Sequence, residues 1–189
     1  MFDQPKLNAV RLYRLRSAEA AALIEFAVAL PLLVVLVVGI FDFGGAFNLK
    51  QELNNAAREG ARFGAAQPTN DVTSTATAPP SVDAIRALVD SYLETAKIND
   101  CGLSSVTGNL AGTLTWQYNT TSCSLTLTIN RGQVVHEVIG GATVNILCTT
   151  VTISYQYQWH FNSVIQLLVP GANYTFSNIT SNATAVNMN

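Results

Sequence analysis

The sequence AALIEFAVALPLLVVLVVGIFDFGG, residues 21–45, decides the organisation of this chain. Thirteen of the eighteen residues from Leu23 to Ile40 are Leu, Ile, Val or Phe, and Glu25 is the one charge among them. Such a run is long enough for a transmembrane helix and too long for the apolar region of a typical secretory signal. Thirteen large apolar side chains at about −0.3 to −0.6 kcal/mol each outweigh one carboxylate that costs roughly 2–3 kcal/mol. The pattern predicts a transmembrane helix over 21–43.

The apolar run is slightly short for a bilayer. Its charge-free part from Phe26 to Phe41 is sixteen residues and covers about 24 Å, against a hydrocarbon layer of roughly 30 Å. We therefore expect Glu25 or Asp42 to be drawn into or against the apolar layer, where an ionisable group indicates a function. The alternative is a carboxylate that reaches the interface near a helix end and has no function.

The next segment, AFNLKQELNNAAREGARFGAA (46–66), follows without a helix-breaking pair, so we expect the helix to continue over 44–66. Small residues recur in it at steps of three and four, and the resulting face permits close approach of another helix or of a sheet. Arg58 and Arg62, four residues apart on the other side, repel each other unless an acidic group faces them. We predict a partner contact there; the alternative is a solvated helix face.

Basic residues lie before the apolar run and almost none lie after it. Because only Lys50 follows within fifteen residues of Asp42, the positive-inside rule places the N-terminus in the cytoplasm and exports the remainder. We expect 1–20 to be a cytoplasmic leader. A cleavable signal peptide with a cut at Gly44-Gly45-Ala46 is the alternative, but the long apolar run and the continuing helix pattern argue against it. The preceding basic residues are Lys6, Arg11, Arg14 and Arg16.

Residues 82–189 are expected to form a small exported α+β domain. The Pro-, Thr- and Ser-rich segment 67–81 is typical of a linker, and Ser81 is the expected N-cap of a helix over 82–96. Alternation over 114–118 and 125–129 predicts a β-hairpin, with Arg131-Gly132 closing its second strand. The fold class is thus an antiparallel sheet packed on helices behind a long N-terminal transmembrane helix.

The second half of this domain leaves more alternatives. Residues 134–139 suit a strand or a short helical turn, and 142–159 gives the strongest strand pattern. Its phase slips at Thr149-Thr150, which indicates either a β-bulge that keeps both halves facing the core or two separate strands. Phe161, Ile165 and Leu168 indicate a short helix or a loop, and 174–179 with 183–188 suit a final hairpin.

Three cysteines, Cys101, Cys123 and Cys148, lie in the exported part. In an oxidising compartment they allow one disulfide and leave one thiol, with three possible pairings. We predict Cys123 with Cys148, because each continues an inward-facing strand alternation.

The sequence offers little for catalysis. It has no Gly-rich phosphate loop, nucleophile elbow or zinc motif, so we expect no enzyme activity, no cofactor and no metal. His136 and His160 are expected to be structural or surface residues. A net charge of −2 with 12% charged residues argues against nucleic acid. Five aromatic residues provide either core or a binding surface for a sugar or a partner: Trp116, Tyr118, Tyr155, Tyr157 and Trp159.

Together, four features of the N-terminal third carry a resemblance: a short basic leader, Glu25 followed by Phe26, Pro31 inside an apolar helix, and AAREGAR at 56–62. This constellation resembles the TadE-type pseudopilins of the tight-adherence (Tad/Flp) pilus system. The resemblance implies a single-pass protein of the bacterial inner membrane with a periplasmic or extracellular C-terminal domain. It also implies that a prepilin peptidase cuts between Ala20 and Ala21, which makes Glu25 the fifth mature residue.

The function that the resemblance implies is that of a minor pilin or pseudopilin in assembly of a Tad-type (type IVc) surface pilus. Its helix would pack with other pilin subunits, and platform membrane proteins of the pilus would be further partners. A permanently membrane-anchored binding module for an extracellular ligand is the alternative, and an enzyme is a distant third. The expected subunit-packing residues are Glu25, Ala57, Gly60, Ala61 and Gly64.

Overall fold

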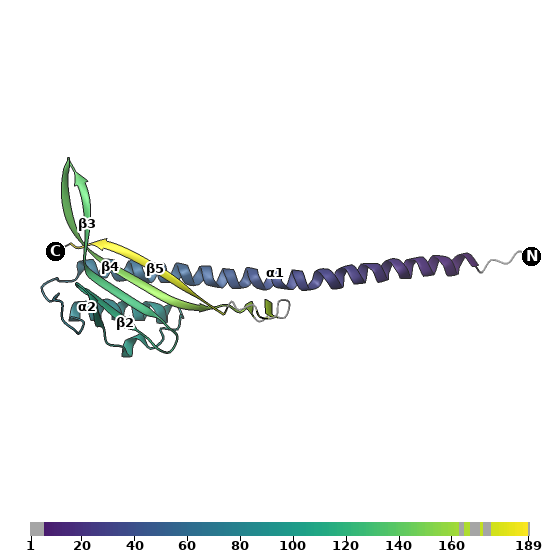
Figure 1. Cartoon of the computed structure of the whole chain (residues 1–189), viewed down its shortest axis with the longest axis horizontal. Coiled ribbons are helices and arrows are strands. Elements are labelled where there is room, and N and C mark those ends of the chain that lie inside the picture. The colour runs from purple at the N-terminus through teal and green to yellow at the C-terminus, as the bar shows by residue number, and fades with distance from the viewer. Residues whose placement is uncertain (1–5, 163–164, 167–170, 172–174, 189) are drawn as a thin grey trace, which may run out of the picture. The chain divides into compact units, whose positions relative to one another are not determined.

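The structure, a computed structural model, describes residues 6–162, 165–166, 171 and 175–188. It divides into two compact units, Met1–Phe43 with His160–Asn173 and Gly44–Trp159 with Tyr174–Asn189, and each is described by itself. Its elements are α1 (Lys6–Ala66), α2 (Pro80–Thr95), the 3-10 helix η1 (Leu103–Ser105), β1 (Asn109–Gly112), β2 (Thr115–Asn119), β3 (Thr126–Ile139), β4 (Ala142–Gln158) and β5 (Phe176–Val186) (Figure 1).

Helix α1 contains the whole predicted span and its continuation. It begins at Lys6, so the predicted leader is helical over most of its length, because no Gly or Pro interrupts 6–20. Pro31 lies inside the helix, where the proline ring removes one backbone hydrogen bond. The helix ends at Ala66, and the Gln67 N–H then donates to the Gly64 carbonyl at 3.1 Å.

Helix α2 begins two residues before the predicted start. Pro80 occupies the first helical position, where its missing N–H is not needed, and Pro79 precedes it in extended conformation. Ser81, the predicted N-cap, therefore lies inside the first turn, and its N–H donates to Asp71 Oδ2 at 2.9 Å. The N-cap prediction was wrong because the proline sets the helical backbone angle one residue earlier.

The five strands form one antiparallel sheet in the order β1-β2-β3-β4-β5. The predicted hairpin is confirmed, with Trp116 opposite Ile129 in β2 and β3. The predicted final hairpin over 174–188 is wrong where the structure describes it, because β5 is a single strand paired with β4 from Phe176 to Val186. No Gly or Pro lies within β5, so nothing turns the chain there and its backbone groups pair with the long β4 instead. Tyr174, Leu168 and the Pro170 turn position lie outside the described residues.

Strand β3 continues past Arg131-Gly132, which was predicted to close it. The register shifts between Asn130 and Gln133, opposite Thr149, so the bulge lies in β3 and not in β4, which is one unbroken strand. Residues 133–148 extend beyond the rest of the sheet as a two-stranded ribbon, here called the β3–β4 arm (Figure 1). Its turn residues Gly140 and Gly141 have φ of +62° and +85°, which glycine adopts without strain.

The β3–β4 arm corrects the prediction that both halves of β4 face the core. No further strand or helix covers this ribbon among the described residues, so its apolar side chains are exposed, with Val138 70% accessible. The alternation of residues 144–148 correctly predicts a strand, but it does not show that the apolar side chains of this strand are buried. The other exposed apolar side chains of the arm are Val134, Val144 and Leu147.

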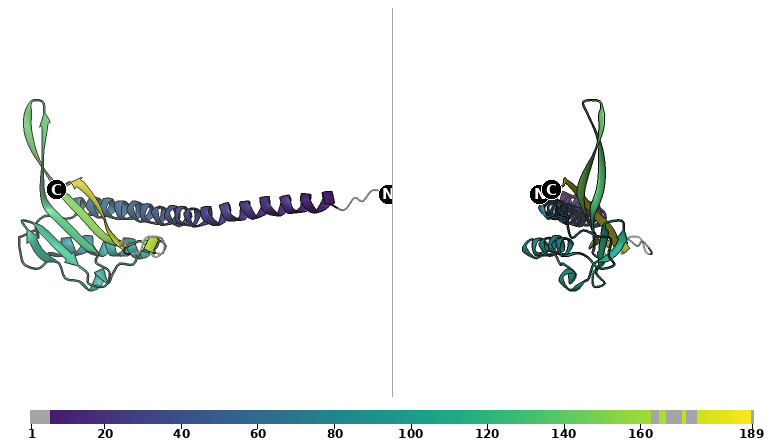
Figure 2. Two further views of the ribbon diagram at one scale, coloured as in Figure 1. Left: turned by 45° about the vertical axis from the view of Figure 1, so that its right-hand side comes forward. Right: turned by 90° about the vertical axis from the view of Figure 1, so that its left-hand side faces the viewer.

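The core of the second unit lies between one face of the sheet, helix α2 and the part of α1 that follows Gly44 (Figure 2). Trp116 and Tyr118 are fully buried in it, and Trp116 Nε1 donates to the Thr75 carbonyl at 3.2 Å. These two residues therefore do not form a binding surface. The α+β class is confirmed. The helical side chains of the core are Leu53, Ala56, Ala57, Ala61, Val82, Ile85, Val89 and Leu93.

Candidate functional site on the N-terminal helix

The apolar half of α1 exposes its side chains on all sides. Leu23 is 69% accessible, Leu32 72% and Ile40 63%. Such exposure of large apolar side chains to water is unfavourable. The helix from Glu19 onward contains a window of mean hydropathy 2.8 with none of its residues buried, and it is the candidate membrane span among the described residues. A helix that is apolar all round and uncovered is suited to lipid or to other apolar helices.

The predicted processing residues lie together at the start of this half. Ala20, Ala21, Glu25 and Phe26 are all exposed on α1. Glu25 is thus accessible for a contact outside the chain, and its role in subunit packing and the predicted cut stay predictions.

At the other end of the apolar half, Asp42 is held by a segment far along the chain. The Phe161 N–H donates to Asp42 Oδ2 at 2.7 Å, and His160 Nδ1 lies 3.0 Å from Asp42 Oδ1. The Phe43 and Phe161 rings stack at 6.3 Å between centroids. Asp42 is only 5% exposed, and these contacts satisfy a carboxylate beside the apolar run. The sequence analysis singled out Asp42 but missed His160 as its neighbour.

The small-residue face of α1 is covered by the chain's own domain. Ala57 and Ala61 are fully buried, and a Cβ at Gly60 would lie 2.9 Å from Val89 Cγ2. A Cβ at Gly64 would lie 2.6 Å from Ile85 Cδ1 and 2.9 Å from Thr149 Cγ2. The prediction that these four residues pack against other subunits is therefore corrected: they admit α2 and β4 of the same chain.

Arg58 and Arg62 lie on the uncovered side of α1. Arg58 is exposed, and Arg62 Nη2 lies 3.1 Å from Glu59 Oε1 with 77% of its side chain accessible. An exposed ion pair of this kind contributes little to stability. Both arginines are thus accessible for a partner contact, which remains a prediction.

The disulfide differs from the predicted one. Cys123 is bonded to Cys101, with Cα atoms 5.4 Å apart, and Cys148 is a buried free thiol. Cys148 lies on β4 opposite Gln133 of β3 and Val186 of β5, so its strand neighbours separate it from the loop that carries Cys123. Strand alternation in both segments does not bring the two sulfurs together.

The two histidines do not converge. His136 Nδ1 lies 2.6 Å from Asn145 Oδ1 across the β3–β4 arm, whereas His160 contacts Asp42 in the other unit. Two aromatic residues of the predicted set, Tyr157 and Trp159, meet edge to face at 4.9 Å at the end of β4. Among the described residues, neither histidine forms a hydrogen bond with a nucleophilic side chain.

The first half of α1 is thus an uncovered apolar helix and a candidate membrane span, and the second half packs with α2 against the sheet. Residues 20–62 match the family model described as TadE-like protein. The resemblance is thereby confirmed for this segment, and TadE-like proteins are involved in the Tad pilus system. Searches of curated proteins and of solved structures found no match to this chain.

Proposed function

We propose that this chain is a minor pilin or pseudopilin that acts in assembly of a Tad-type (type IVc) surface pilus. The observation that carries the proposal is the division of α1 into two halves. Residues such as Leu23 and Ile40 are uncovered, whereas Leu53 and Ala57 are buried in the chain's own domain. The first half is therefore available to lipid and then to the helices of other pilin subunits, while the second half anchors the exported domain.

In the proposed route, the chain is inserted in the inner membrane with its N-terminus in the cytoplasm. A prepilin peptidase then cuts the leader between Ala20 and Ala21. Packing with other pilins, aided by platform membrane proteins of the pilus, draws the helix out of the bilayer. Four basic residues before the span and one soon after it support this orientation.

Glu25 is the residue that this route depends on most. Its carboxylate would pair with the free amine of Ala21 on a neighbouring subunit, a contact strengthened where water is excluded. An unpaired carboxylate inside an apolar helix bundle is costly, so the pairing would favour one register between neighbouring helices. Exposure of Glu25 in the single chain supports this role, and Arg58 and Arg62 would contact an acidic patch of a partner.

The β3–β4 arm favours a second candidate function, a permanently anchored binding module. Among the described residues, no further strand pairs with the outer edges of its two strands between Val134 and Ile146, and free strand edges accept extended peptides. The two functions differ at the N-terminus. Mass spectrometry of the purified protein would find a start at Ala21 in the pilin route and an intact leader in the tether.

The proposed function is tested by Glu25→Ala in cells that assemble the pilus. We expect the variant to remain in the membrane fraction but to leave the cells without pili by electron microscopy. Glu59→Ala is the matched control, a carboxylate removed further along the same helix, and should retain pili. Normal pilus numbers in Glu25→Ala cells would contradict the pairing, and normal numbers after removal of the whole chain would contradict a role in assembly.

A further inference from the structure

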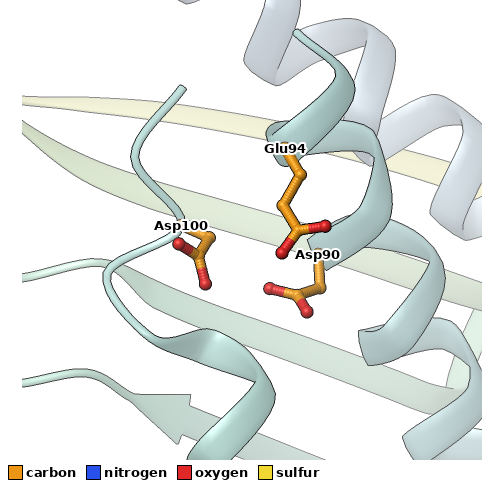
Figure 3. A group of neighbouring side chains, drawn as sticks. All are labelled: Asp90, Glu94 and Asp100. Carbon is orange, nitrogen blue, oxygen red and sulfur yellow. The ribbon is translucent and has the colours of Figure 1, made fainter. Parts of the chain in front are cut away.

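Three carboxylates converge beside the end of α2 (Figure 3). Asp90 and Glu94 lie one turn apart on the helix, and Asp100 comes from the loop that follows it. One ligand oxygen from each residue lies within 4.8 Å of the others, and Figure 3 shows the carboxylates of Asp90 and Glu94 directed toward each other with Asp100 facing them across a gap. Three negative charges at this spacing repel one another strongly.

The loop that carries Asp100 is held in place by the backbone and by a covalent bond. After α2 ends, the Ile98 N–H donates to the Leu93 carbonyl at 2.9 Å, which turns the chain back along the helix. Cys101, the residue directly after Asp100, is bonded to Cys123. Asp100 therefore cannot easily swing away from the other two carboxylates to relieve the repulsion.

Asp90 provides a second, independent observation. It is 8% exposed, and its Oδ1 is a buried atom with no hydrogen-bond donor among the described residues. A buried carboxylate oxygen without a donor is unfavourable unless a proton or a cation compensates it. Arg86 Nε lies 3.7 Å from Asp83 Oδ1, and among the described residues Arg86 forms no ion pair with the cluster.

We propose that Asp90, Glu94 and Asp100 bind a calcium ion. Two oxygens that share one ion at about 2.4 Å each lie at most about 4.8 Å apart. The three ligand oxygens of this cluster all lie within 4.8 Å of one another, so one ion can reach them together. Calcium accepts carboxylates in flexible geometry and takes its remaining ligands from water, whereas magnesium requires a near-ideal octahedron. Half-exposed Asp100 and exposed Glu94 leave the outer side open to solvent for that water.

The ion would join the end of α2 to the disulfide loop. The site does not depend on the role of the chain in a pilus, but an exported domain meets calcium at concentrations that match weak extracellular sites, with Kd of about 0.1–1 mM. The ion would stabilise the folded domain by binding it and not the unfolded chain.

The test is calorimetric titration of the full chain in detergent with calcium chloride, together with thermal unfolding. We expect one saturable site and, for a Kd of about 0.1 mM, a rise in Tm of about 3–6 °C at 1 mM calcium. Magnesium chloride at the same concentration should give a smaller rise. An equal effect of magnesium would overturn the assignment to calcium.

Two variants test whether the calcium ion binds at these three carboxylates. Asp90→Asn and, should that variant fold poorly, Asp100→Asn should each lose the titration heat and the rise in Tm. Glu59→Gln, a change in a carboxylate outside the cluster, should keep both. Calcium binding retained by the Asp variants, or no saturable heat in the wild type up to about 10 mM calcium, would refute the site and leave a proton as the group that compensates Asp90.

Discussion

The close packing at Gly64 makes a sharp prediction for Gly64→Ala. A Cβ there would lie 2.6 Å from Ile85 Cδ1 and 2.9 Å from Thr149 Cγ2, well inside an ordinary contact of 3.4–4 Å. The end of the Ile85 side chain can rotate away. Thr149 cannot easily do so, because it is fully buried on β4, is paired with Ala185 of β5, and donates its hydroxyl to Asn187 Oδ1 at 2.7 Å.

Two opposing effects decide the magnitude. Replacing glycine by alanine inside a helix gains about 1 kcal/mol. Overpacking of a closed core costs about 1–3 kcal/mol, so we expect Gly64→Ala to lower the free energy of unfolding by about 0–2 kcal/mol. At the centre of that range, the Tm falls by about 2–4 °C.

The control separates the two effects. Arg58 is exposed on the same helix, so the difference between Arg58→Ala and Arg58→Gly measures helix propensity without a packing change. Near-UV circular dichroism of buried Trp116 follows unfolding of the full chain in detergent. Subtracting the gain at position 58 from the effect at position 64 gives the packing cost, expected at about 1–3 kcal/mol. If Gly64→Ala gains the full propensity value, the reasoning about a covered face is wrong.

Two further predictions concern the exported domain. Under non-reducing conditions, peptide mass mapping should find Cys101 linked to Cys123 and Cys148 free to alkylate, and a Cys123–Cys148 peptide would contradict this pairing. Because the disulfide restricts the unfolded chain, Cys101→Ser should lower the free energy of unfolding by about 3 kcal/mol. Burial, followed by the hydrogen bond to Asp83 Oδ1 at 2.8 Å, raises the pKa of Tyr118 above its unfolded value of about 10. The stability from its neutral phenol is complete below about pH 10 and is lost as pH rises toward the folded pKa, by up to about 1.4 kcal/mol per pH unit. Unfolding measured against pH should show a shallower alkaline loss in Tyr118→Phe, and an unchanged slope would contradict the assignment.

The N-terminal residues alone were enough to predict the candidate membrane span and the resemblance to TadE-like proteins. Whether a run such as Leu23–Ile40 suits a bilayer depends on local composition and length, which need no knowledge of the rest of the chain. The β2–β3 hairpin was predictable for the same reason, because alternation around Trp116 and Ile129 is a local pattern. The resemblance to TadE-like proteins also rests on this contiguous segment.

Only the tertiary structure decided which segments pack against the faces that these local patterns define. The face with Gly60 and Gly64 permits close approach by any partner, and the fold supplies α2 and β4 of the same chain. Alternation in β4 predicts a strand but cannot say where the sheet stops, so the exposure of Val144 was missed.

Long-range pairs were hidden for the same physical reason. Asp42 and His160 are 118 residues apart, and the approach of Asp100 to Asp90 depends on how the chain turns after α2. Periodicity specifies secondary structure and the side chains that share a face. The partners of that face are set by how distant segments exclude water together, and this information is spread over the whole chain.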